Sequence, residues 1–336
     1  MICFPVSEGF PKHRMAFGGP FMAEQHFSYA DHSGTGTIYA QIWLPETLPV
    51  RGVLQIAHGL NEYGGRYGDF AVYLNSQGWV VAAADHYGHG KSGSPGGQLG
   101  TLAPGHGWLH MLEDMRTLSS RLRRDWPDLP LFLMGHSMGS FLVRDLLLRY
   151  PDAYAGILLS GTGSNPRVLY DVGLGFCWIL TLFKGRHGHS RLVRDLVLGR
   201  YARPFRTEGS PIAWLSRDPH VYQSCAQDPL CTYLPDLEYF LQFLAGMRHM
   251  DRPRKLAQLP KNLPILLFSG SRDPVGGNSR GVCRIYRRLV EQGCSVELLL
   301  YPGGRHEMLN EINKDQVYQD VWEWLEDHLA EGPHPS

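Results

Sequence analysis

The stretch Leu131-Phe132-Leu133-Met134-Gly135-His136-Ser137-Met138-Gly139-Ser140 decides the fold of this chain. A short apolar run, preceded by Pro130, ends at Gly-His-Ser-Met-Gly, and apolar residues then recur at helical spacing as far as Leu147. This pattern predicts a strand, a sharp turn and a helix, with Ser137 at the turn. In such a nucleophile elbow the serine hydroxyl is exposed, and the two glycines let the strand and the helix pack closely around it. Ser137 is therefore the candidate nucleophile.

Strands and helices alternate on both sides of this turn. Apolar runs that predict buried strands lie at 52–57, 79–84, 155–159, 264–270 and 296–301. Helical periodicity covers 70–74, 108–124, 280–291 and 317–329, and alternating residues at 24–31 and 37–44 predict an antiparallel hairpin at the edge of the sheet. Because strands joined through helices by short loops run parallel, we predict an α/β fold whose mostly parallel sheet carries helices on both faces.

The alternation breaks between residues 161 and 260, where helical pieces, prolines and aromatic residues replace the strands. We therefore expect a helical cap, or lid, over 161–260. It would be inserted into an α/β core formed by 23–160 and 261–332, after a lead-in at 1–22. The first residues lack the basic start and continuous apolar core of a signal peptide, and no apolar run is long enough to span a bilayer.

Charge and cysteine usage exclude several classes of protein. Lys and Arg total 32 and so do Asp and Glu, so no net charge would attract nucleic acid. Charged residues are 19% and aromatic residues 11% of the chain, which is a globular composition. Six scattered cysteines without a Cys-x-x-Cys pair favour free thiols in a reducing cytoplasm, with a Cys225–Cys231 bridge as the alternative. We expect a cytoplasmic protein.

A nucleophilic serine needs a base, and the base needs an orienting carboxylate. Asp273 follows the strand at 264–270, and His306 follows the next strand along the chain. Both come after strands of a parallel sheet, at the edge that carries Ser137, and in the order serine, acid, histidine that accompanies a nucleophile elbow of this kind. Glu307 and Glu311 are alternative acids, although Glu307 would point away if a helix began there. We predict the triad Ser137, Asp273 and His306.

The oxyanion of an acyl-transfer intermediate needs two backbone N–H donors. One comes from the residue after the nucleophile, which is Met138. The other comes from the loop after an early strand, here His58-Gly59-Leu60, and we select Leu60.

Two other motifs resemble cofactor sites. Residues 88–93 match Gly-x-Gly-x-x-Gly, but no helix begins there, and the phosphate-loop pattern needs glycine where Asp85 stands. The histidines at 86, 89, 187 and 189 lack carboxylate or cysteine partners at useful spacing. We therefore predict neither a cofactor nor a metal.

Together these motifs resemble the monoglyceride lipase and lysophospholipase branch of the α/β-hydrolases, also grouped as serine aminopeptidase-like hydrolases. The matching residues, over roughly 50–160 and 262–330, are His58-Gly59-x-x-Glu62 with Gly65-Arg66-Tyr67, Asp85-His86-x-Gly88-His89-Gly90-x-Ser92, Gly135-His136-Ser137-Met138-Gly139, Gly270-x-x-Asp273 and Tyr301-x-Gly303-x-x-His306. The resemblance implies an esterase of one-chain lipids that uses this triad and no cofactor. The chain departs from the family at Asn61-Glu62-Tyr63, where Gly-Glu-His is usual, and the cap shows no match.

The most apolar part of the cap runs from Val168 to Phe183 and is followed by several basic residues. It is either an ordinary helix packed on the core or a lid that lines an acyl pocket and touches lipid surfaces. In the second interpretation the substrate-binding residues are His58, Phe176, Trp178 and Leu180.

The function that we predict is hydrolysis of carboxylic esters of single-chain lipids, of monoacylglycerol or lysophospholipid type, through an acyl-enzyme on Ser137. A broad carboxylesterase remains an alternative, and so does an amidase or aminopeptidase in which Glu62 or Asp228 holds a free amine. A receptor without turnover is the alternative from another class, whereas serine at 137 excludes the usual aspartate-based dehalogenases and epoxide hydrolases. Transient membrane contact through the cap and the oligomeric state stay open.

Overall fold

The computed structural model describes residues 22–46, 49–197 and 199–329. The predicted lead-in and Cys3 therefore lie outside the described residues, except for Met22. The described chain forms one eight-stranded sheet in the order β1-β2-β4-β3-β5-β6-β7-β8. The strands are β1 (Met22–Ala30), β2 (Thr37–Pro45), β3 (Gly52–Ala57), β4 (Trp79–Ala84), β5 (Leu131–His136), β6 (Gly156–Ser160), β7 (Ile265–Gly270) and β8 (Val296–Tyr301).

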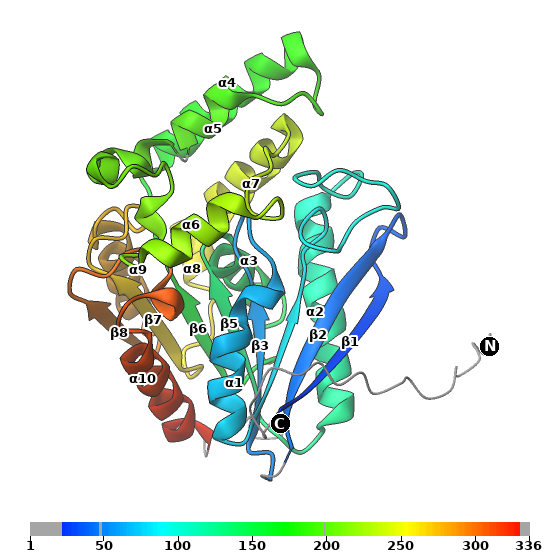
Figure 1. The fold of residues 1–336 in the computed structure, drawn as a ribbon, viewed down its shortest axis with the longest axis vertical. Helices are drawn as coiled ribbons and strands as arrows, with labels where there is room; N and C mark the ends of the chain where they lie inside the picture. The colour runs from blue at the N-terminus through cyan, green and yellow to red at the C-terminus, as the bar shows by residue number, and fades with distance from the viewer. Residues whose placement is uncertain (1–21, 47–48, 198, 330–336) are drawn as a thin grey trace.

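Strands β3 to β8 are parallel, whereas β1 and β2 form an antiparallel hairpin and β2 pairs with β4 in the antiparallel sense. Helices cover both faces, which explains why the central strands are continuous apolar runs. On one face lie α1 (Gly68–Ser76) and α10 (Lys314–Asp327), and on the other lie α2 (Gly107–Asp125), α3 (Met138–Leu147) and α9 (Arg280–Glu291) (Figure 1). The predicted α/β fold with a mostly parallel sheet is confirmed.

Helices α4 to α8 form a layer beyond the carboxyl ends of the parallel strands (Figure 1). They are α4 (Arg167–Lys184), α5 (Arg191–Val197), α6 (Pro219–Gln227), α7 (Leu237–Met250) and α8 (Pro253–Leu256), with short 3-10 turns at Gly199–Glu208 and Ala213–Leu215. Helix α7 packs on α2 and α3, and α4 packs on α7. The described part of 161–260 contains no strand of the sheet, and we retain the proposal that this range is an inserted cap.

A buried carboxylate ties the cap to the core. Asp251, which follows α7, accepts hydrogen bonds from the Arg144 guanidinium on α3 and from the hydroxyls of Ser164 and Tyr170, the last two at 2.9 and 2.8 Å. Because Tyr170 lies on α4, this one carboxylate joins the beginning of the cap, its end and the helix that follows the elbow.

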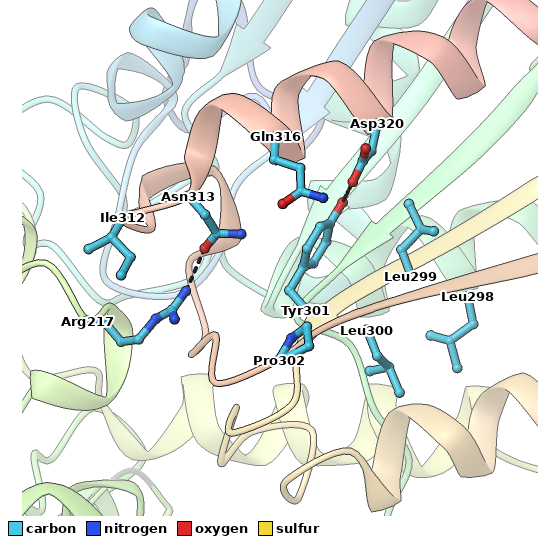
Figure 2. A pocket seen from close by; sticks show the side chains of 10 residues that line it. All are labelled: Arg217, Leu298, Leu299, Leu300, Tyr301, Pro302, Ile312, Asn313, Gln316 and Asp320. Atoms are coloured by element: carbon cyan, nitrogen blue, oxygen red, sulfur yellow. Dashed lines mark hydrogen bonds between the residues drawn. The ribbon is translucent and has the colours of Figure 1, made fainter.

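A separate hollow of about 470 Å³ lies beside the edge strand β8 (Figure 2). Four of its polar side chains form pairs, since Tyr301 donates to Asp320 at 2.9 Å and Arg217 donates to Asn313, and Arg217 also donates to Glu311 outside the lining. None of the predicted site residues lines it.

No helix in the described ranges has the length and apolar content needed to cross a membrane. The described cysteines, including Cys225 and Cys231, are free thiols, so the alternative of a Cys225–Cys231 bridge does not describe this structure.

Candidate active site

Ser137 lies at the turn between β5 and α3 in a conformation that ordinary residues rarely adopt. Its backbone has φ 51° and ψ −118°. The two glycines of the motif permit this turn, because a Cβ on Gly139 would collide with the carbonyl groups of Ala57 and His58, and one on Gly135 would collide with the backbone of Gly139. The sequence therefore folds into the expected elbow, and Ser137 lines the main cavity.

Asp273 and His306 meet at the ends of β7 and β8. The His306 Nδ1 atom lies 3.1 Å from both carboxylate oxygens of Asp273, and both side chains are buried. The Val275 N–H donates to the same carboxylate at 2.8 Å, and the Ser269 hydroxyl donates at 3.3 Å. These donors fix the carboxylate, which in turn fixes the imidazole ring.

The environment of His306 favours a protonated ring during catalysis. Burial lowers the pKa of His306, but the charge and hydrogen bond of Asp273 outweigh burial and raise this pKa above its usual value. The rings of His136 and Trp214 flank His306, with centroids 4.6 and 5.1 Å away. Burial also holds the pKa of His136 well below its usual value. His136 is therefore neutral and does not oppose a positive charge on His306.

Ser137 and His306 line the same cavity. Among the described residues, the Ser137 hydroxyl and His306 do not form a hydrogen bond. In ligand-free enzymes such catalytic hydrogen bonds are often long, and they shorten when substrate binds.

Leu60 and Met138, the two proposed oxyanion donors, line the same cavity. Met138 is the first residue of α3, so its N–H has no acceptor within the helix. Leu60 belongs to the loop after β3, which we call the oxyanion loop (residues 58–62). The residues of both proposed donors therefore line the same cavity as Ser137.

Buried hydrogen bonds within the oxyanion loop and from His86 fix its backbone. The Gly59 N–H donates to the Glu62 carboxylate. His58 donates from Nδ1 to the Gly59 carbonyl at 2.8 Å and accepts the His86 N–H at Nε2 at 2.9 Å. Both ring nitrogens of His58 are therefore occupied, and the ring is fully buried. His58 therefore supports the loop and does not line the cavity. The prediction that His58 contacts substrate does not agree with this position.

A buried guanidinium connects the oxyanion loop with the histidine loop. Arg66 donates to both oxygens of Glu307 at 2.7 Å and to Glu62 at 3.2 Å. Burial raises the pKa of Glu307, but Arg66 outweighs burial and lowers this pKa to about 2, whereas burial raises the pKa of Glu62 to about 7. The Glu307 carboxylate is therefore bound by Arg66, whereas Asp273 and not Glu307 forms the hydrogen bond to His306 Nδ1.

The cavity has a volume of about 820 Å³ and two kinds of lining. The apolar lining comes from α3, α4, α5 and α7 and includes Phe141, Leu169, Val172, Phe176, Val193, Leu196, Phe243, Leu244 and Met247. One polar part of the lining comes from the oxyanion loop, its continuation, the segment before α7 and the loop after β8, and includes Asn61, Glu62, Arg66, Thr232, Tyr233 and Glu307. A second polar part lies beside the cap helices and consists of Asn165, Arg194, Asp195 and Arg200.

Helix α4 presents only one face to this cavity. Leu169, Val172, Gly173 and Phe176 recur at the spacing of one helical face and line the cavity. Trp178 comes two residues after Phe176, about 200° further around the helix, and is 56% exposed. Leu180 packs against the hydrophobic core outside the lining. Of the predicted pocket residues, the structure therefore brings only Phe176 to the cavity.

Several residues of this site had no role in the sequence interpretation. Arg66 stood in a matched motif, which was the available signal, but its partner Glu307 lies 241 residues away. His136 stood inside the elbow motif, whereas Trp214 belongs to a part of the cap without a pattern. Within the described ranges, no three His, Cys, Asp or Glu side chains are arranged to hold a metal ion.

A profile of the family described as Serine aminopeptidase, S33, matches residues 49–313. The chain belongs to this family. It is 33% identical over 307 residues to the monoacylglycerol lipase of Mycolicibacterium smegmatis, which spans 90% of this chain and 97% of that protein. It is 24% identical over 299 residues to the monoglyceride lipase of Homo sapiens, spanning 87% and 88% of the two chains.

Among solved structures, a highly thermostable carboxyl esterase from Bacillus coagulans in complex with glycerol superposes with a TM-score of 0.85 at 28% identity and covers 92% of this chain and 99% of its own. The resemblance that the sequence motifs indicated is thus confirmed, and so is the α/β-hydrolase fold that the S33 family shares with these relatives.

Proposed function

We propose that this carboxylic ester hydrolase cleaves the esters of single-chain lipids through an acyl-enzyme on Ser137. The observation that carries the proposal is a cavity of about 820 Å³ that is lined by Ser137 and His306, by many apolar side chains of α3, α4, α5 and α7, and by polar side chains of the oxyanion loop. An acyl chain suits the apolar lining from α3, α4 and α7, and a polar alcohol suits the lining near Asn61 and Thr232. Relatives named monoacylglycerol lipase and carboxyl esterase support the same chemistry.

The proposed reaction has an acylation step and a deacylation step, and His306 transfers a proton in both. The Ser137 oxygen attacks the acyl carbon while His306 takes its proton, and the N–H groups of Leu60 and Met138 stabilise the oxyanion. The bond to the alcohol then breaks, and His306 gives its proton to the departing oxygen. Water then attacks the acyl-enzyme while His306 takes its proton. His306 returns this proton to the Ser137 oxygen as the ester bond to Ser137 breaks and the acid is released, and Asp273 keeps the His306 ring oriented throughout.

The outer face of α4 supports contact with a lipid surface. Trp178, Leu182 and Phe183 are 56%, 63% and 81% exposed, and Lys184 and Arg186 follow them on the same arm. Exposed apolar side chains beside basic residues are typical of segments that lie in the interface of a membrane. We include transient docking of the cap on lipid in the proposed function.

The two carboxylates considered for an aminopeptidase are both engaged. Glu62 accepts from Gly59, Tyr67 and Arg66. Asp228 accepts the Tyr63 hydroxyl at 2.9 Å and the Leu230 N–H at 2.8 Å. Because neither is available to bind a free amine, the arrangement favours an ester over an aminoacyl amide.

The test is hydrolysis of nitrophenyl esters with two to sixteen acyl carbons, alongside monoacylglycerols, a lysophospholipid and an aminoacyl anilide. Each buried methylene contributes about 0.8 kcal/mol, so kcat/KM should rise by up to about fourfold per carbon until the cavity is full. The Ser137→Ala variant should lose this activity. A flat chain-length profile would contradict the acyl site, and turnover of the anilide alone would move the assignment to a peptidase.

A further inference from the structure

Two residues in which this chain departs from the family motif both reach the cap. In Asn61-Glu62-Tyr63, Asn61 replaces the usual glycine and Tyr63 replaces the usual histidine. Asn61 donates from Nδ2 to the Tyr233 carbonyl at 2.7 Å and from its backbone N–H to the Tyr233 hydroxyl at 3.2 Å. The Tyr63 hydroxyl donates to Asp228 at 2.9 Å. The departures therefore tie the end of the oxyanion loop and the residue after it to the cap segment 228–233.

The local backbone explains why asparagine can occupy this position. Asn61 has φ 59°, which lies in the left-handed region that glycine adopts most easily and asparagine tolerates better than most residues. Asparagine thus preserves the turn and adds one side-chain donor, Nδ2, to the backbone N–H that a glycine would also present to Tyr233. The next residue on the amino-terminal side is Leu60, whose N–H is the proposed oxyanion donor.

Tyr233 is itself held by the core. Its ring packs edge-on against His89, with centroids 5.7 Å apart, and lies so close to Gly100 that a Cβ there would come within 2.9 Å of the ring. The Asp236 N–H, three residues on, donates to the Gly100 carbonyl at 3.0 Å. The Tyr233 hydroxyl and carbonyl, which accept the two hydrogen bonds from Asn61, are therefore held in place by the core.

We propose that Tyr233 of the cap is a positioning residue for the oxyanion hole. Tyr233 accepts the two hydrogen bonds of Asn61, and His58 and Glu62 bind the carbonyl and the N–H of Gly59. Leu60 lies between these two fixed residues, so its N–H points at the developing oxyanion. The cap thereby takes part in stabilising the transition state as well as in shaping the cavity. This inference rests on the proposed function and on Leu60 as the donor.

The substitutions separate the two bonds. Tyr233→Phe removes the acceptor of the Asn61 N–H, and Asn61→Gly removes the side-chain bond while it suits the left-handed backbone. Losing one oxyanion donor lowers kcat by about 10²–10³-fold. Because these variants only loosen the donor, we expect each to lower kcat by roughly five- to twentyfold with KM within twofold of wild type, and the double variant to lower it further.

A pair of inhibitors distinguishes positioning from a loss of cavity shape. An alkyl trifluoromethyl ketone adds to Ser137 as a tetrahedral oxyanion, whereas an alkyl ether of the same length occupies the cavity without reacting. Ketone affinity should fall by the same factor as kcat/KM in Tyr233→Phe and Asn61→Gly, and ether affinity should not change. Tyr154→Phe is the matched control, because the buried Tyr154 hydroxyl contacts Ser119 at 2.7 Å, outside the cavity lining.

Kinetics and ketone affinity within twofold of wild type in both single variants and in the double variant would overturn the inference. Equal losses of ketone and ether affinity would also overturn it, because Tyr233 would then only shape the cavity. If Tyr233→Phe does not fold, Asn61→Gly alone decides. A wild-type protein without Ser137-dependent ester hydrolysis would instead contradict the proposed function, so the two failures are distinguishable.

Discussion

Asp273 sets the pH at which His306 can accept a proton. Only the neutral ring is a base, so activity disappears as the pH falls through the pKa of His306 in the free enzyme. Asp273 raises that pKa against the opposing effect of burial. The acid limb of the kcat/KM profile should therefore lie above about 6.5, the ordinary value for histidine.

The Asp273→Asn variant should move the acid limb of kcat/KM to lower pH, because the charge that raises the His306 pKa is gone while burial remains. The same change should lower kcat by roughly 10³–10⁴-fold, since the ring loses its orientation. Profiles of nitrophenyl butyrate hydrolysis between pH 5 and 9 measure both effects. Asp320→Asn, at the surface hollow beside β8, is the matched control and should leave the limb in place; an unmoved limb in Asp273→Asn would exclude Asp273 as the orienting acid.

The sequence alone predicts the residues of the catalytic triad, because their types follow from the chemistry and their positions follow from the order of the strands. The places of Ser137, Asp273 and His306 follow from a known order of strands, and the structure brings Asp273 and His306 into contact. The pairing of Arg66 with Glu307 could not be predicted, because it depends on the tertiary arrangement of two loops and no local pattern encodes it.

Helix α4 has two different apolar faces. The face with Phe176 lines the cavity, and the face with Leu182 and Phe183 is exposed. Because nearly every side of this helix is apolar, its sequence shows no polar stripe that would identify the outer face. This explains why Trp178 could be predicted to bind substrate although it lies outside the cavity.

Substitutions on the two faces of α4 should separate docking from catalysis. Leu182→Ser together with Phe183→Ser should weaken sedimentation with phosphatidylcholine–phosphatidylglycerol vesicles by about tenfold or more, because each side chain loses up to about 1.5–3 kcal/mol of burial in lipid. Hydrolysis of the soluble butyrate ester should remain within twofold of wild type.

Phe176→Ala on the inner face is the counterpart. It should flatten the chain-length profile of kcat/KM and leave vesicle binding unchanged. Vesicle binding that survives the loss of Leu182 and Phe183 would assign the lipid contact to another surface.

At the scale of the whole molecule, the cap contacts the core through the apolar packing of α7 on α2 and α3 and through a few buried polar groups. Asp251 is the centre of one such group, which joins Arg144 on α3 with Ser164 and Tyr170 at the entry to the cap. The alternation of strands and helices predicted the core, whereas the cap has no such period. The contacts that attach the cap to the core could therefore not be predicted from the sequence.

Asp251→Ala should destabilise the protein by about 3–5 kcal/mol, because it leaves the Arg144 charge buried without a partner. The midpoint and slope of urea unfolding measure this loss. Asp125→Ala is the control, since Asp125 pairs with Arg121 and Arg124 at the surface and should contribute less than about 1 kcal/mol. Equal midpoints in the two variants would show that Asp251 does not hold the fold together.

The backbone of Ser137 also limits how this protein can evolve. A non-glycine residue in such a conformation costs about 1–3 kcal/mol, out of a net stability of about 5–15 kcal/mol for a typical domain. Every variant inherits this cost, so fewer destabilising substitutions can accumulate before the chain unfolds. New substrate preferences should therefore arise first at positions where change is nearly neutral for stability, and the exposed residues of α4 offer many of these, whereas the elbow offers none.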